Sequence, residues 1–110
     1  MAKSFDFNKI KPKTMNVTLS DENKTVLSVM TPDKKLRDDL VALYDNVDET
    51  DEDEINEALY DLSARVMSRN KQGIEINSKQ LKELFPDHMF IMAFLNAYIE
   101  FVGEVADSKN

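Results

Sequence analysis

Residues 25–36 read TVLSVMTPDKKL, and the change of pattern within them decides the fold. The first half, TVLSVM at 25–30, is rich in residues that favour β-strands. Thr31, Pro32 and Asp33 then have the pattern of a helix start, with threonine as the N-cap, proline at the first helical position and an acid in the first turn. The sequence therefore predicts that a strand gives way to a helix here.

On the N-terminal side of this stretch, a second run of alternating residues predicts another strand. Met15, Val17 and Leu19 alternate with polar residues, which is the period of a half-buried strand. The segment SDENK at 20–24 has the composition of a turn, so residues 15–30 are predicted to form a β-hairpin. Because an isolated hairpin is barely stable in water, it should pack on helices or pair with strands of another chain.

On the C-terminal side, the spacing of apolar residues predicts four helices. They are expected at about 32–46, at 51–70 with Thr50 as N-cap and Gly73 in a left-handed conformation after its end, at 78–85 with Ser78 as N-cap, and at 87–105 with Asp87 as N-cap. The predicted fold class is α+β and mostly α, with a hairpin at 15–30, helices at 32–105 and the C-terminal helix most buried. A basic N-terminal arm at 1–14 and a disordered tail at 107–110 are expected to flank this single domain at 15–106.

Composition narrows the classes of protein to which the chain can belong. The formal net charge is -7, with 32% charged and 42% hydrophobic residues, which suits a globular domain. An acidic chain repels phosphate backbones, so no nucleic-acid partner is expected. The N-terminus lacks the apolar core of a signal peptide, and Asn96 and Glu100 interrupt the only long apolar segment, so neither a leader nor a membrane partner is expected. A cytosolic protein is the simplest interpretation.

No group of residues in the sequence has the spacing that catalysis or metal binding requires. In the acidic run that begins at Asp48, a calcium loop would need glycine where Asp53 stands and glutamate where Leu59 stands. His88 is the only histidine and there is no cysteine, so no metal site is expected. Two glycines cannot build a phosphate-binding loop, and no nucleophile stands beside an oriented base. We therefore predict a protein that is not an enzyme and has no cofactor.

The most unusual feature is the last helix, DHMFIMAFLNAYIEF at 87–101, which is apolar nearly all the way round. One interpretation makes it the central helix of a small bundle, covered by the other helices and the hairpin. The other makes part of its surface an interface for a partner or for self-association, because interfaces favour aromatic and methionine side chains. The candidate partner-binding residues are Phe90, Phe94, Tyr98, Phe101, Met89 and Met92. The two interpretations are compatible, since one helix has more than one face.

The second half of the chain resembles a known family. The segments LSARVMSRNKQGIEINSKQLKELF, at 62–85, and FLNAYIEFVGEV, at 94–105, look like those of the small tail assembly chaperones of long-tailed bacteriophages that infect Gram-positive bacteria. In such chains a helix that ends in Asn-Lys-x-Gly leads to an extended link, a short helix with Gln-Leu, and a terminal helix with the pattern Phe-x-x-Ala-Tyr-x-x-Phe. The resemblance covers roughly residues 27–105 and is one of pattern, without a catalytic motif.

This resemblance implies a function as a chaperone of virus assembly. Such a protein binds the tape measure protein, keeps this long helical partner soluble while tail tube protein subunits assemble, and is absent from the mature virion. It would act in the host cytoplasm. Two alternatives remain open from the residues alone: an acidic DNA-mimic inhibitor of a nucleic-acid-binding protein, and a structural adaptor of the phage head or tail.

Overall fold

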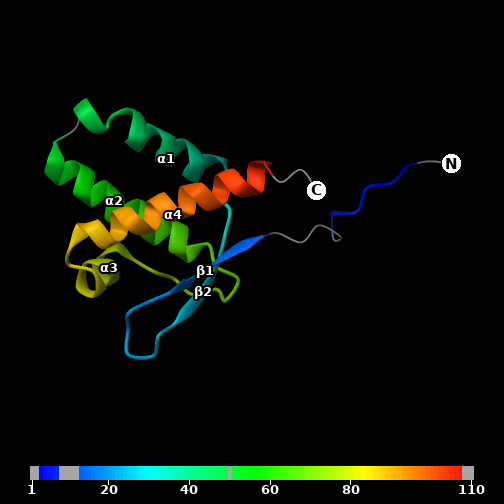
Figure 1. The fold of residues 1–110 in the computed structure, drawn as a ribbon. Coiled ribbons are helices and arrows are strands. Elements are labelled where there is room, and N and C mark those ends of the chain that lie inside the picture. Colours follow the sequence, from blue (N-terminus) through cyan, green and yellow to red (C-terminus); the bar gives the residue numbers. More distant parts are fainter. Residues whose placement is uncertain (1–2, 8–12, 50, 108–110) are drawn as a thin grey trace.

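A computed structural model of the chain describes residues 3–7, 13–49 and 51–107, and there the hairpin precedes four α-helices (Figure 1). The elements are β1 Thr14–Thr18, β2 Val26–Met30, α1 Lys34–Asp45, the 3-10 turn η2 Val47–Glu49, α2 Glu52–Ser68, α3 Ser78–Leu84 and α4 His88–Asp107. The predicted fold class, α+β and mostly α, is confirmed. Strand β1 begins one residue before the predicted hairpin, and α4 extends two residues beyond its predicted end.

The hairpin is held on both sides of β2. The two strands are antiparallel, with Thr14 opposite Met30, and Asp21 closes the turn by accepting hydrogen bonds from the amide and hydroxyl of Thr25. The other edge of β2 pairs with the segment that follows α2, since the amide of Met30 donates to the carbonyl of Arg69 at 2.7 Å. The hairpin is therefore stabilised by contacts within its own chain and does not need strands of another chain.

Two of the predicted helix caps are wrong by one or two residues. Asp33, and not Thr31, caps α1, because its Oδ1 accepts a hydrogen bond from the amide of Leu36 at 2.9 Å. Asn77, and not Ser78, caps α3, because its side chain and that of Gln80 exchange hydrogen bonds with each other's amides, which is a capping box. The third predicted cap, Thr50, lies outside the described residues.

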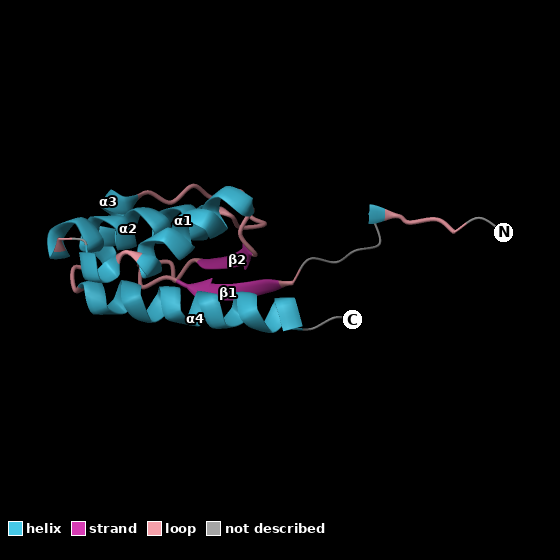
Figure 2. Ribbon diagram, turned by 90° about the horizontal axis from the view of Figure 1, so that it is seen from above, coloured by secondary structure: helices cyan, strands magenta, loops and turns pink. Residues whose placement is uncertain are grey.

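The most enclosed helix is α2, and the expectation that the C-terminal helix would be the most buried is wrong. Helix α2 packs against α1, α3, α4 and β2, and it contributes more residues to the core than any other element. Its buried residues are Leu59, Tyr60, Leu62, Ser63, Ala64, Val66 and Met67. Helix α4 runs along one edge of the domain beside the hairpin (Figure 2) and buries only Ile91, Leu95 and Tyr98. An edge helix is covered on one face only, whatever its hydrophobicity.

The turn that follows α2 is built around a buried asparagine. The Nδ2 of Asn70 donates to the carbonyls of Met67 and Ile74, each at 2.7 Å, and its Oδ1 accepts from the amide of Ile74 at 2.9 Å. Gly73 has a φ of 71°, which confirms the predicted left-handed conformation. These bonds join the end of α2 to the extended link before α3.

We expect Asn70→Ala to lower the free energy of unfolding by about 2 kcal/mol, because it leaves buried backbone groups without partners. Gln72→Ala is the matched control: Gln72 also hydrogen-bonds to the backbone, at Ser28, but it is exposed and water can replace it. Urea denaturation followed by circular dichroism measures both. Equal losses in the two variants would contradict a structural role specific to Asn70.

A charged cluster connects α1 to α2. Asp39 accepts a hydrogen bond from Arg65 at 2.7 Å, and Lys35 lies 3.5 Å from the same carboxylate oxygen. The hydrogen bond from Arg65 lowers the pKa of Asp39 below its ordinary value of 3.8. Because the pKa is lower in the folded state, the ionised carboxylate stabilises the fold above the unfolded-state pKa, and this stabilisation is lost as the pH falls through the folded-state pKa.

Replacing this carboxylate should therefore change the thermal stability by an amount that depends on pH. We expect Asp39→Asn to lower Tm slightly at about pH 7 and to lose this effect in acid, at a pH below the folded-state pKa of Asp39, where the native carboxyl group is protonated as well. The effect is small because the pair is exposed to solvent. Thermal melts at the two pH values test this expectation, and a Tm difference that persists in acid would refute it.

The N-terminal arm is described only in part. In residues 3–7, Phe5 and Phe7 are exposed and their rings meet edge to face at 4.7 Å. The rest of the arm before Lys13 and the tail at 108–110, for which disorder is predicted, lie outside the described residues.

Candidate functional site

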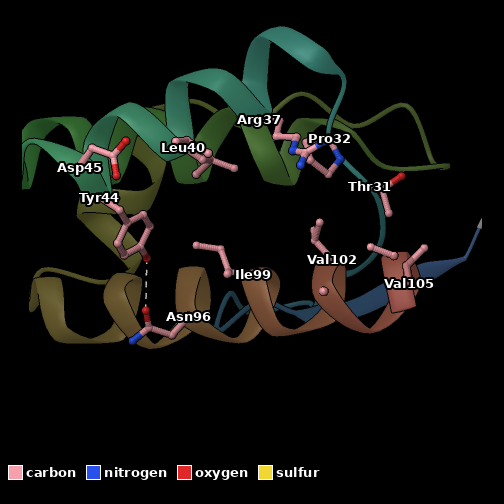
Figure 3. Close-up of a pocket in the computed structure, with 13 residues that line it drawn as sticks. Thr31, Pro32, Arg37, Leu40, Tyr44, Asp45, Asn96, Ile99, Val102 and Val105 are labelled. Carbon is pink, nitrogen blue, oxygen red and sulfur yellow. Dashed lines mark hydrogen bonds between the residues drawn. The ribbon is translucent and has the colours of Figure 1, made fainter. Parts of the chain in front are cut away.

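An open groove separates α1 from α4 (Figure 3). Helix α2 packs against both of them, whereas α1 and α4 approach each other little. One hydrogen bond crosses the gap, from the hydroxyl of Tyr44 on α1 to Oδ1 of Asn96 on α4, at 3.2 Å. The two helices run in opposite directions, so the end of α1 at Tyr44 faces the first half of α4.

The larger part of this groove has a volume of about 690 Å³ and is mainly apolar. Helix α1 supplies Leu40 and Val41, and α4 supplies Ile99, Val102 and Val105. Figure 3 shows the side chains of Leu40, Ile99 and Val102 between the two helices. Ile99 is 38% exposed and Val41 is 51% exposed, although both are large hydrophobic residues. This part of the domain thus leaves apolar surface open to a partner.

A smaller cavity of about 220 Å³ continues the groove beyond the hydrogen bond between Tyr44 and Asn96. Its apolar lining residues come from α1, η2, α2 and α4 and are Leu43, Val47, Ile55, Leu59 and Met92. Together the two cavities follow α4 from His88 to Ala106. We call this continuous feature the α1/α4 groove.

The sequence of α4 explains why the helix is apolar on more than one face. Its buried residues are Ile91, Leu95 and Tyr98, which recur at helical spacing and pack into the core. A second row, also at spacings of three and four, lies next to the first and lines the groove: His88, Met92, Asn96, Ile99, Gly103 and Ala106. The first row serves the core and the second leaves apolar surface exposed.

The predicted partner-binding residues lie in different environments. Met92 lines the smaller cavity. Met89 and Phe90 are 58% and 62% exposed but lie outside the groove, and the ring of Phe90 is 6.2 Å from that of Phe85. Phe94 and Phe101 are half-buried, and each ring lies next to the ring of Tyr98, at 6.3 Å and 6.2 Å respectively. The structure therefore does not bring the six residues together as one surface.

Among these residues, Tyr98 departs most clearly from its predicted role in partner binding. It is 0% exposed, and its hydroxyl donates a hydrogen bond to the carbonyl of Met30 at 2.9 Å. Burial raises the pKa of the Tyr98 hydroxyl well above its usual value, so the group stays protonated and remains a donor. Tyr98 is thus a core residue that holds α4 against β2, and it offers no surface to a partner.

Sequence reasoning missed the residues that line the larger cavity, among them Ile99, Val102 and Val41. The helical period of α4 contains the second row, but only knowledge of which face meets the core separates that row from the first. On α1, Val41 follows the buried Leu40 and would be assigned to solvent by periodicity alone.

Charged residues of opposite sign line different parts of the α1/α4 groove. Arg37 lies near Thr31 and Pro32 at one end, and Asp45 lies beside Tyr44 toward the other (Figure 3). Neither Arg37 nor Asp45 takes part in the ion pairs formed among the described residues. Partial burial raises the pKa of Tyr44, which keeps its hydroxyl protonated as the donor to Asn96.

The described residues include no group of three or more histidine and acidic side chains placed to hold a metal ion. The groove itself offers mostly hydrocarbon, with the amides of Asn56 and Asn96, the phenol of Tyr44, the imidazole of His88, the hydroxyl of Thr31 and the charges of Arg37, Asp45 and Glu52. Such a surface can bind an apolar side chain or helix.

Helix α4 is also long and apolar enough, by length and composition alone, to cross a membrane. Only 17% of the residues from His88 to Ala106 are buried within the protein. The apolar side chains of α4 nevertheless have two roles in the fold, because one row packs into the core and the next lines the groove. The expectation of no membrane partner stays a prediction.

Fold and site together define a small, mostly helical α+β domain with an elongated apolar groove between two antiparallel helices. In comparisons with known proteins, no protein-family model matches the chain, and no curated protein or solved structure does either. The function must therefore be argued from the groove and from the pattern of the sequence.

Proposed function

We propose that this protein is a non-enzymatic assembly chaperone that binds an apolar helical segment of a partner protein in the α1/α4 groove. The observation that carries the proposal is the second row of α4, which keeps Met92 and Ile99 exposed next to the buried core row. Isolated exposed apolar residues are ordinary on protein surfaces, but a groove lined by them over the length of a helix suits helix-in-groove recognition.

The resemblance to phage tail assembly chaperones suggests which partner this is. On that proposal, the client is the tape measure protein, a long helical chain that exposes apolar side chains until tail tube protein surrounds it. The acidic surface of the domain would keep the loaded complex soluble through its net charge of -7. The chain would act in the host cytoplasm and leave before the virion is complete.

The alternative of a DNA mimic receives less support from the arrangement of the acids. A mimic needs unpaired carboxylates spaced along a face like phosphates. Here Asp39 pairs with Arg65, and Glu57 pairs with Lys82. In the first turn of α2, three acids interact favourably with the partial positive charge of the helix N-terminus: Glu52, Asp53 and Glu54. These carboxylates already have structural roles within the domain.

Co-expression with the tape measure protein from the same genome tests the proposal. We expect the tape measure protein to be insoluble alone and to copurify with this chain when both are present. Capture of a nuclease or polymerase in place of the tape measure protein would favour the DNA mimic. Retention of the chain in purified virus particles would favour a structural adaptor.

A further inference from the structure

The charges that line the groove carry information about how a helix would lie in it. Of the residues that line the end near Thr31, Arg37 is the charged one, whereas Asp45 and Glu52 line the part near Tyr44 and His88. A helix has a partial positive charge at its N-terminus and a partial negative charge at its C-terminus. The favoured orientation places the N-terminal half of the bound helix near Glu52 and Asp45 and its C-terminus near Arg37.

A second, independent observation concerns Gly103, which lies inside α4 and lines the same groove. Glycine destabilises a helix interior relative to alanine, so its presence needs a reason. A Cβ added at Gly103 would have no heavy atom of the described chain within 4 Å beyond its immediate surroundings. Packing within this protein therefore does not require glycine there, whereas close approach of another backbone would.

We propose that the α1/α4 groove receives one amphipathic helix of a partner, which runs in the same direction as α4, has a basic N-terminal half near Glu52 and Asp45 and comes closest to α4 at Gly103. This inference rests on the proposed function, because it assumes that the groove binds a helix. From His88 to Ala106, α4 rises roughly 27 Å at about 1.5 Å per residue, so a helix of about 18 residues would fill the groove.

The direction can be tested with two synthetic peptides of about 18 residues that share composition and apolar positions. One has lysines in its first two turns and glutamates in its last two, and the other has these charges exchanged. Both are acetylated, amidated and hydrocarbon-stapled, and circular dichroism checks that their helicity is equal, because these charges also act on each peptide's own dipole. Calorimetry should show about tenfold tighter binding of the peptide with lysines first.

Charge exchange in the protein provides the matched control. In the double variant R37D/D45R, the ratio of the two affinities should fall by at least about threefold, because the charges at positions 37 and 45 are exchanged while Glu52 is unchanged. Equal binding of both peptides to the natural protein would overturn the orientation and leave the proposed function standing. Failure of both peptides to bind would overturn the orientation and the proposed function together.

The close approach at Gly103 is tested by Gly103→Leu, with Ala97→Leu as the control on an exposed position of the same helix that does not line the groove. We expect Gly103→Leu to raise Tm, since leucine favours a helix. We also expect it to lower the affinity for the peptide with lysines first by about tenfold. Ala97→Leu should leave that affinity unchanged. An unchanged affinity in Gly103→Leu would overturn the close approach. A dimer of the protein alone that Gly103→Leu dissociates would make a second copy the occupant and overturn the proposal.

Discussion

Truncating Tyr98 to alanine should lower the free energy of unfolding by about 4 kcal/mol. The side chain is fully buried between the half-buried rings of Phe94 and Phe101, and its hydroxyl bonds to Met30 at the end of β2. Tyr98→Ala therefore removes core packing and also leaves a backbone carbonyl without its donor. Since domains of this size are stable by about 5–15 kcal/mol, the loss is a large fraction of the total stability.

Two further variants separate the contribution of the Tyr98 hydroxyl from that of its ring and compare a buried ring with an exposed one. Tyr98→Phe keeps the ring and removes the hydroxyl, so it should cost about 1–2 kcal/mol. Phe90→Ala removes an aromatic ring from the same helix at an exposed position and should cost less than about 1 kcal/mol. Chemical denaturation at several temperatures measures all three. Similar losses for Tyr98→Ala and Phe90→Ala would contradict the assignment of Tyr98 to the core and of Phe90 to the surface.

The sequence predicts the elements of this fold well because their signals are local. Alternation around Val17 and the β-favouring residues at 25–30 indicate strands whichever helices cover them, and the left-handed Gly73 is indicated by its place after a helix. The caps of α1 and α3 were misplaced because Thr31, Asp33, Asn77 and Ser78 are all good capping residues. Backbone geometry at each helix start decides between such neighbours, and the residue types alone do not.

The groove could not be predicted in the same way, because it depends on how far apart two helices lie. The sequence identified α4 as unusually apolar, but its rows of residues are alike in hydrophobicity, so composition does not distinguish Tyr98 from Ile99. The distinction arises when α2 receives one row and α1 stays at a distance, joined to α4 mainly through Tyr44 and Asn96. Such long-range packing is a property of the assembled domain and leaves no short pattern in the chain.

An aspartate at position 99 should abolish partner binding while leaving the domain folded. Ile99 lies near the middle of the larger cavity, between Leu40 on α1 and Val102 on α4, where an apolar side chain of a bound helix would be fully desolvated. A carboxylate there would be buried without a partner on binding, so we expect Ile99→Asp to weaken binding by at least about 30-fold, or ~2 kcal/mol. In the free protein position 99 is 38% exposed, and the carboxylate remains hydrated.

Ala97→Asp is the matched control, because it places the same charge on the same helix at an exposed position outside the groove. Ala97→Asp and Ile99→Asp change the net charge equally, and both place an aspartate inside α4. Both variants should therefore retain the far-ultraviolet circular dichroism of the natural protein. Copurification of the tape measure protein and calorimetry with the peptide that has lysines first should both fail for Ile99→Asp and succeed for Ala97→Asp. Equal binding by the two variants would mean that the partner uses another surface, and the exposed Met89 and Phe90 would be the next residues to replace.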